Sequence, residues 1–443
     1  MNSRSAQVIV VGGGVSGLQA AHQAQQSGAS CLVLEATSRI GGQAFSSSNI
    51  NAVNHPRTYE LAKKLQLASE YQNSQDGGLG DLVSQLNNDD FQSYTRVLYN
   101  IDDLAMQIDI NQPETSMCSF GDMTVQDLAV FQGAAPAVLK IVDSWTLSIF
   151  GASSSKVSAL HFLTHCKSCD GLVNAIEALT GAGHNLHIED ASHNICQQLA
   201  GMLQEGSIQT MQQVVQIEQL ADNECTVTTH TGAVYQCAKV ILAGSSAMCK
   251  NIAFVPELSD EKTWVQMAQD GGFRTTVQVL FDHAWWQERN LSGFAQGTDG
   301  PIVQVSPSNC GIEGLHALTC TIAGEDARNM WTWSMGDDER EFAIMQHLGS
   351  IFGGSIPRAV QVMEQQVNPL IAGEQSLNVP LANMLDMSVD QWRPEGNVHF
   401  SGADTSFVWR GHIEGALNAG ERAAAEAMTA LRGEVAVDMA ARL

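Results

Sequence analysis

The sequence predicts an α/β protein built on a doubly wound parallel sheet, and three observations near the N-terminus support this. The apolar run Gln7-Val8-Ile9-Val10-Val11 has the length of one buried parallel strand. It leads into Gly12-Gly13-Gly14-Val15-Ser16-Gly17, which fits the pattern G-x-G-x-x-G. Residues 18–27 then have a helical pattern, and a second apolar strand over residues 31–34 ends at Glu35.

Each glycine of this motif has its own physical role. Gly12 permits the tight turn, Gly14 lets a pyrophosphate approach the backbone, and Gly17 lets the helix pack closely on the strand. The helix start offers free N–H groups and a positive dipole end to phosphates. Glu35 follows Gly14 by 21 residues, where a carboxylate can accept hydrogen bonds from ribose hydroxyls. Strand, spacing and acid together indicate a dinucleotide site.

Length and composition narrow the class of protein. A chain of 443 residues is too long for one simple core, so two intertwined domains are expected. With 44% hydrophobic and 16% charged residues, the chain has the composition of a well-packed soluble enzyme. The net charge of −25 repels nucleic acid and anionic lipid, so neither is expected as a partner. No apolar stretch approaches a membrane span and no signal peptide is expected, which predicts an intracellular protein.

The cysteines and the last three residues give weaker signals. Ten cysteines scattered through an intracellular chain are expected to be reduced, mostly buried thiols. Cys166-Lys167-Ser168-Cys169 is a single CxxC beside His165, and no second pair completes a zinc site, so we assign no metal. Ala441-Arg442-Leu443 is a relaxed form of the SKL-type peroxisomal targeting signal, so a peroxisomal location is one expectation.

Beyond the first strand pair, we expect an amphipathic helix over residues 60–70, an exposed polar connection over 72–90, and mostly helices over 100–203. Strands are expected at residues 208–220, 225–229, 234–243 and 275–281, with more strand over 302–322 and turns at 221–223 and 231–232. Near the C-terminus, strand 398–401 leads into Gly402-Ala403-Asp404 and then into a helix that runs to Leu431. A helix N-terminus there suits a polar edge of a bound ring.

The two ends of the chain together resemble the flavin-containing amine oxidases, the monoamine oxidase family, and are nearest to its soluble fungal members. The most specific match is the block from Trp409 to Ala424, WRGHIEGALNAGERAA. The other matching segments are Leu34-Glu35-Ala36, Arg39-Ile40-Gly41-Gly42, Val157–Leu163, Val214–Glu218, Val240–Ala243 and Ser401–Ser406. The resemblance therefore covers nearly the whole chain.

This resemblance implies FAD as cofactor, a Rossmann-like FAD domain, and an α+β substrate domain inserted in two pieces. The FAD domain would comprise residues 1–70, 204–265 and 386–443, and the substrate domain 71–203 and 266–385. By the same resemblance Glu35 binds the ribose, Arg39 flanks the pyrophosphate, Val214 meets adenine, Asp404 takes the ribityl or phosphate side, and Ile413 faces the flavin ring. The predicted cofactor-binding residues are Gly12, Gly14, Val15, Ser16, Gly17, Glu35, Ala36, Arg39, Gly41, Gly42, Gln43, Val214, Gly402, Asp404 and Ile413.

Several positions depart from the family pattern. Gln43 stands where the family has Arg, and the flavin-facing loop after it is shortened to residues 46–51. The family lysine near the flavin falls at Thr276, and residues 372–377 lack the cysteine that tethers flavin in some members, so binding is expected to be non-covalent. These departures concern the flavin-facing side of the site.

The predicted catalytic residues are Trp409 and His412. Many members of the family have a cage of two aromatic rings in front of the flavin. Trp409 matches the family, but His412 stands where the cage has a tyrosine, and the other ring of the cage is missing near Glu374-Gln375. His412 is expected to line the substrate pocket, and a proton acceptor or hydrogen-bond donor role is the alternative.

Three functions remain open at this point. The first is oxidation of the C–N bond of a small amine by hydride transfer to flavin, with oxygen as acceptor and peroxide as product. The second is a desaturase, oxidative cyclase or double-bond isomerase that acts on a non-amine metabolite. The third is a non-catalytic flavoprotein. A homo-oligomer is left open.

Overall fold

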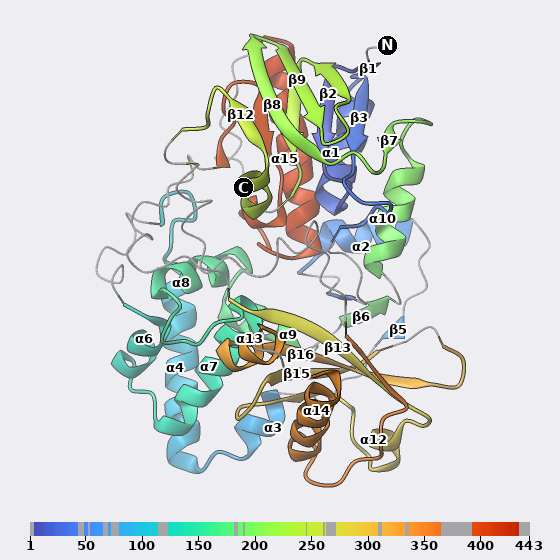
Figure 1. Cartoon of the computed structure of the whole chain (residues 1–443). Helices are drawn as coiled ribbons and strands as arrows, with labels where there is room; N and C mark the ends of the chain where they lie inside the picture. Colours follow the sequence, from blue (N-terminus) through green and yellow to red (C-terminus); the bar gives the residue numbers. More distant parts are fainter. Residues whose placement is uncertain are drawn as a thin grey trace.

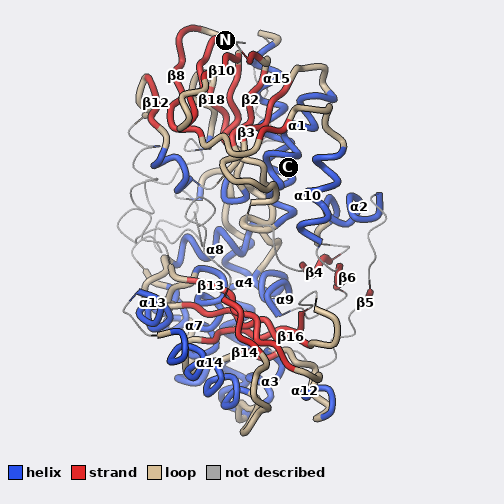
Figure 2. Tube along the Cα trace, turned by 45° about the vertical axis from the view of Figure 1, so that its right-hand side comes forward, coloured by secondary structure: helices blue, strands red, loops and turns tan. Residues whose placement is uncertain are grey.

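Parallel strands with two long helices form one half of the molecule, and an antiparallel sheet with a helical bundle forms the other (Figure 1). The computed structural model describes residues 4–42, 48–51, 54–64, 70–71, 79–113, 123–180, 185–188, 191–244, 246–259, 262, 272–308, 312–332, 336–364 and 392–433. Figure 2 shows the same two halves from the side, with α2 and the short strands β4 to β6 at the level of their junction.

The parallel sheet runs in the order β18-β11-β2-β3-β7. Its strands are β2 (Val8–Val11), β3 (Cys31–Leu34), β7 (Ile208–Gln209), β11 (Lys239–Leu242) and β18 (Val398–Phe400), and all neighbours pair in parallel. β2 and β11 are buried along their whole length, as expected for a sheet covered on both faces. One face packs on α1 (Val15–Gln26) and α15 (Ile413–Leu431), which lie side by side in Figure 1. The predicted doubly wound fold is confirmed.

A second sheet covers the other face, in the order β1-β10-β9-β8-β12. Its strands are β1 (Arg4–Ser5), β8 (Val214–Ala221), β9 (Glu224–Thr229), β10 (Val234–Cys237) and β12 (Ala253–Val255). Two strand predictions were wrong here. Residues 208–220 form two strands, β7 and β8, in different sheets, and residues 234–243 likewise divide into β10 and β11. The second change of sheet occurs at Ala238, where the N–H groups of Ala238 and Lys239 both donate to the Gln7 carbonyl.

Helices predominate between residues 56 and 201. They are α2 (Pro56–Lys64), α3 (Leu79–Ser84), α4 (Asn88–Met106), α6 (Val125–Phe131), α7 (Pro136–Phe150), α8 (Ala159–Ser168), α9 (Leu172–Thr180) and α10 (Ala191–Gly201). The helix predicted over 60–70 begins earlier, because Pro56 is well suited to a first helical turn. The exposed connection predicted over 72–90 contains α3 and the start of α4, whose first turn is capped by the Asn87 side chain.

The third sheet is antiparallel and runs β14-β15-β16-β13-β17. Its strands are β13 (Arg274–Phe281), β14 (Ala295–Gln296), β15 (Ile302–Ser308), β16 (His316–Ala323) and β17 (Gln361–Glu364), flanked by α12 (Trp285–Glu288), α13 (Glu325–Thr332) and α14 (Asp337–Ile351). A small sheet of β4 (Ser48–Asn51), β6 (Asn185–Ile188) and β5 (Glu70–Tyr71) completes the fold. Within the described ranges, no helix is long and apolar enough to cross a membrane.

Candidate active site

The glycine turn between β2 and α1 has the geometry of a dinucleotide cradle. Gly12 has a φ of +108°, and a Cβ there would run into the Ala243 carbonyl. A Cβ at Gly17 would run into the Gly12 carbonyl, so close packing of helix on strand requires glycine at both positions. A Cβ at Gly14, by contrast, would meet nothing within 4 Å. That open space at a helix N-terminus without a side-chain cap fits a pyrophosphate.

Glu35 is held in place by the backbone around it. The Gly13 N–H donates to Oε2 at 2.7 Å, and the Thr37 N–H and hydroxyl both donate to Oε1 at 2.8 Å. Oε2 accepts one hydrogen bond and can accept another, so the buried, fixed carboxylate can still receive a ribose hydroxyl. The Gln212 N–H donates to the Glu35 carbonyl at 2.8 Å, which brings the start of β8 at Val214 to the same end of the sheet.

The segment after β3 lies directly against the glycine turn. The Gly41 N–H donates to the Gly13 carbonyl at 2.8 Å, and a Cβ on Gly42 would be 3.4 Å from the Gly14 Cα. The Thr37 hydroxyl also lies 2.7 Å from the Arg39 carbonyl, which is an alternative acceptor to Glu35 Oε1 for its single proton. Gln43 lies outside the described residues.

The C-terminal segment closes the cradle from the other side. The Ser16 hydroxyl donates to the Ser401 carbonyl at 2.8 Å, which ties the start of α1 to the end of β18. A Cβ at Gly402 would collide with the Asp404 carboxylate and the Gly244 carbonyl. The Gly411 N–H donates to the Ala403 carbonyl at 3.0 Å, which holds the start of α15 beside this turn. Ile413 is the first residue of α15, which also lacks a side-chain cap, so its N–H suits a ring oxygen.

Trp409 is strained and buried next to this helix start. Its φ of +48° lies in the left-handed region, which is unusual for a bulky side chain, and its N–H donates to the Ser168 carbonyl at 2.7 Å. Its ring stands edge-on to His55 and His412, with centroids 4.3 Å and 5.2 Å away. A strained aromatic residue fixed at such a position is typical of a functional site.

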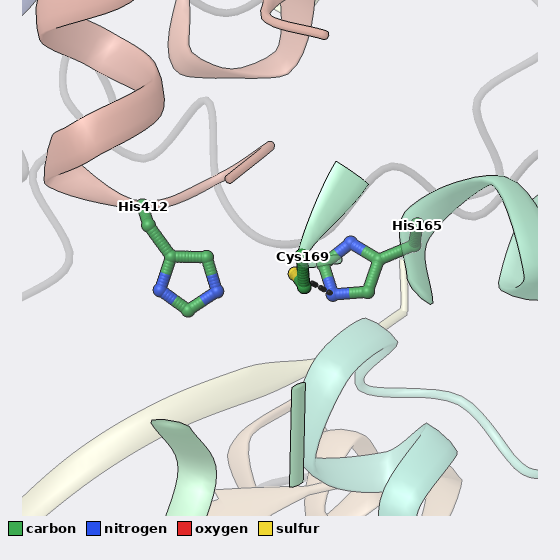
Figure 3. Close-up of side chains that lie close together, drawn as sticks. All are labelled: His165, Cys169 and His412. Atoms are coloured by element: carbon green, nitrogen blue, oxygen red, sulfur yellow. Dashed lines mark hydrogen bonds between the residues drawn. The ribbon is translucent and has the colours of Figure 1, made fainter. Parts of the chain in front are cut away.

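His412 lies in a cluster of imidazoles and a thiol (Figure 3). The Cys169 Sγ lies 3.8 Å from the His165 Nε2, and these atoms and a ring nitrogen of His412 all lie within 4.8 Å of one another. The His412 ring is also 6.1 Å from the ring of His55. Figure 3 shows His412 arriving from the segment before α15, whereas His165 belongs to α8. Three separate stretches of sequence therefore contribute to one cluster when Trp409 and His55 are counted.

Burial keeps these imidazoles neutral. It lowers the pKa of His412 to about 3, with a further lowering from His55 and Arg274, and lowers the pKa of His55 to about 4. The pKa of His165 is also well below its ordinary value, chiefly through burial. Neutral imidazoles with such low pKa values accept a hydrogen bond near neutral pH and stay unprotonated.

The same groups form a nitrogen and sulfur donor set, but their charge environment disfavours a metal cation. Burial raises the pKa of the Cys169 thiol to about 12, so the thiol stays protonated near neutral pH. The Arg410 guanidinium is close enough to lower the pKa of both Cys169 and His165. A soft cation would need the thiolate and would be repelled by this guanidinium.

Near the position of the family lysine, the structure places a cation that the sequence analysis did not identify. Thr276 lies on β13 as expected, and Arg274 lies two residues before it on the same strand. Alternate residues of a strand share one face, so Arg274 and Thr276 point the same way. Arg274 lies close enough to lower the pKa of His412. Sequence reasoning missed this cation, although the period of two along the strand could have revealed it.

Comparison with known proteins decides the family. The family described as flavin containing amine oxidoreductase matches residues 15–428. This chain belongs to that family. It is 24% identical to flavin-containing amine oxidase A of Sus scrofa over 96% of this chain and 85% of the relative. It is 22% identical to a probable flavin-containing monoamine oxidase A of Dictyostelium discoideum over 95% and 96% of the two chains.

Solved structures show the same fold. Putrescine oxidase bound to putrescine superimposes with a TM-score of 0.84 at 19% identity, covering 95% of this chain and 98% of that chain. Cyclohexylamine oxidase from Brevibacterium oxydans superimposes with a TM-score of 0.84 at 22% identity, covering 96% and 99%. The family membership and the open, glycine-lined cradle agree that flavin, as FAD, is the cofactor.

Proposed function

We propose that this chain oxidises the C–N bond of a small amine, with non-covalently bound FAD as hydride acceptor and oxygen as the final acceptor. The observation that carries the proposal is the pair of uncapped helix N-termini, that of α1 with open space at Gly14 and that of α15 beside the cluster of Trp409 and His412. The first end suits the pyrophosphate of the cofactor and the second suits its ring. A substrate at His412 would then lie against the ring.

The residues of this chain would bind and orient the neutral amine. When bound, FAD supplies the two-electron acceptor for the C–H hydride. A protonated amine cannot release hydride readily, and the neutral His412 imidazole, whose pKa lies at about 3, would accept a hydrogen bond from a neutral amine. Trp409, buried and held by Ser168, would form an apolar wall that excludes water.

The division of the chain is proposed on the same basis. Residues 1–70, 204–265 and 386–443 would form the FAD domain, and residues 71–203 and 266–385 would form the substrate domain. The cofactor residues would be those predicted above, with Gln43 added by resemblance alone. A peroxisomal location would rest on Ala441-Arg442-Leu443, which lie outside the described residues, and it would suit an enzyme that produces peroxide.

The test is a spectrum followed by a substrate panel. Purified protein should be yellow, and primary amines should bleach the flavin band without oxygen and yield peroxide with it. A parallel His412→Ala variant should keep its flavin and change turnover, whereas His230→Ala, at an exposed position in the turn after β9, should change neither. Protein that takes up no FAD, or yellow protein that reacts with no amine, would contradict the proposal.

A second function is favoured by the substituted positions. Thr276 stands at the lysine position and His412 at the cage tyrosine position, so a desaturase, oxidative cyclase or double-bond isomerase acting on a non-amine metabolite is the alternative. Bleaching of the flavin by non-amine metabolites alone would support it.

A further inference from the structure

We propose that Arg274 binds a carboxylate of the substrate, so that the molecule oxidised carries both an amine and a carboxylate. This inference rests on the proposed function and adds a substrate class to it. An amino acid, or a small molecule with the same two groups, is the chemistry that the pocket fits.

Arg274 is placed at the cluster by the way β13 begins. The strand starts against the end of α7, where the Phe273 N–H donates to the Gly151 carbonyl at 3.0 Å. A Cβ on Gly272 would collide with the Phe150 carbonyl, so the two segments are in close contact. The Phe150 ring in turn packs on His165, with centroids 5.4 Å apart. The first residue of β13 is therefore fixed next to the imidazoles.

Within the described part of the chain, no acidic side chain pairs with the guanidinium of Arg274. Its side chain makes no hydrogen bond or ion pair with any residue that the structure describes. Burial lowers the pKa of Arg274, and the residue is only partly exposed. Leaving a guanidinium desolvated and unpaired is costly, and a bound carboxylate with two parallel hydrogen bonds would remove that cost.

The second guanidinium near the cluster is already matched. Arg410 donates through Nε to the Ser406 carbonyl at 3.1 Å, and the nearby carboxylate of Asp404 raises its pKa against the effect of burial. The neighbouring imidazoles are neutral, since the pKa values of His55 and His412 lie at about 4 and 3. Among the residues that the structure describes, Arg274 is thus a positive charge near His412 with no carboxylate partner, and it would repel the second ammonium of a diamine.

The binding test uses holoenzyme and two probes with the same carbon skeleton, 3-phenylpropionate and 3-phenylpropylamine. Affinity is followed by the change each probe causes in the visible flavin spectrum. Arg274→Met should weaken 3-phenylpropionate at least tenfold, and should leave the amine equal or tighter. Arg274→Lys should restore part of the carboxylate affinity. Arg432→Met removes an exposed arginine after α15 and should change neither affinity.

The activity test compares phenylalanine with phenethylamine. We expect a higher kcat/KM for the amino acid, and we expect Arg274→Met to reverse that order mainly through KM. Amine oxidation with kcat/KM unaffected by Arg274→Met would overturn the carboxylate proposal and keep the proposed function. Arg274-dependent binding of 3-phenylpropionate without oxidation of any amine would keep the carboxylate proposal and overturn the proposed function. Loss of flavin in both Arg274→Met and Arg274→Ala would assign Arg274 to the cofactor and also overturn the proposal.

Discussion

The cofactor cradle and the imidazole cluster are formed by different kinds of chemical group. In the cradle the functional groups are backbone N–H groups, helix ends and the empty space beside Gly14, with Glu35 as the main side chain. In the cluster they are side chains, His55, His165, Cys169 and His412, packed around Trp409. A backbone site depends on the local course of the chain, whereas a side-chain site depends on how distant segments meet.

This difference determines which kinds of substitution damage each region. In the cradle, a single added methyl group either fills the ligand space or collides with the fold. In the cluster, damage comes through charge and through the contacts that hold the segments together. The four predictions below separate these effects, in order of decreasing size.

The junction between the regions should be the most sensitive point. Glu414, in the first turn of α15, is buried and accepts hydrogen bonds from the Thr58 N–H and hydroxyl, both at 2.8 Å, and from the Arg57 N–H at 3.1 Å. Glu414→Ala should lower the free energy of unfolding by about 3–5 kcal/mol, because it leaves buried partners without their acceptor.

Urea unfolding measures this loss, and Glu421→Ala is the matched control. Glu421 contacts the same Arg57 at 3.1 Å, but its side chain is 39% exposed. That change should cost under about 1 kcal/mol. Equal effects of the two substitutions would show that α2 and α15 are not joined through Glu414.

Gly14→Val should remove the cofactor and spare the fold. The added side chain meets no protein atom at its Cβ, but it occupies the space that suits the pyrophosphate. Affinity for FAD should fall about 100-fold or more, equivalent to about 2.8 kcal/mol. Flavin absorbance per protein and the circular dichroism spectrum test the two halves of this prediction. Gly201→Val, at an equally open position at the end of α10, should retain stoichiometric flavin.

Gly17→Ala should do the reverse and damage the fold first. Its Cβ would press on the Gly12 carbonyl and lie 2.9 Å from the Ala243 Cβ. Overpacking of this kind costs about 1–3 kcal/mol, which a lower urea midpoint would reveal. If Gly17→Ala unfolds at the same urea concentration as the parent, α1 does not pack on β2 as closely as described.

The cluster should make the protein sensitive to acid. The unfolded chain protonates its histidines below pH 6.5, whereas folded His412 stays neutral down to a pKa of about 3. The unfolded state therefore binds more protons in this window, and the free energy of unfolding falls as the pH falls, by about 1.4 kcal/mol per pH unit for each such group.

His412→Asn should reduce this slope by about one group, measured by urea unfolding of the holoenzyme between pH 7 and pH 5. His230→Asn replaces an exposed histidine and should leave the slope unchanged. A slope in His412→Asn equal to that of the parent would show that His412 is protonated in the folded protein.

Local patterns predicted the cradle well and the cluster poorly, for the same physical reason. The turn from Gly12 to Gly17 and the acid at Glu35 are close in sequence, so spacing alone places them in space. Thr37, which orients Glu35, was missed because its role depends on a hydroxyl direction that no spacing reveals. His55 and His165 meet His412 only after the two halves pack together. The unpaired charge of Arg274 likewise becomes visible only in three dimensions.

The order of strands in the parallel sheet bears on how this protein is made. Its three adjacent strands β18, β11 and β2 begin at residues 398, 239 and 8, and α15, which covers them, ends at Leu431. Pairing of such distant segments is slow, because loop-closure entropy is lost before the contacts form. The parallel sheet can therefore form completely only after the segment up to Leu431 has left the ribosome. We expect chaperone binding and aggregation to occur mostly before that point.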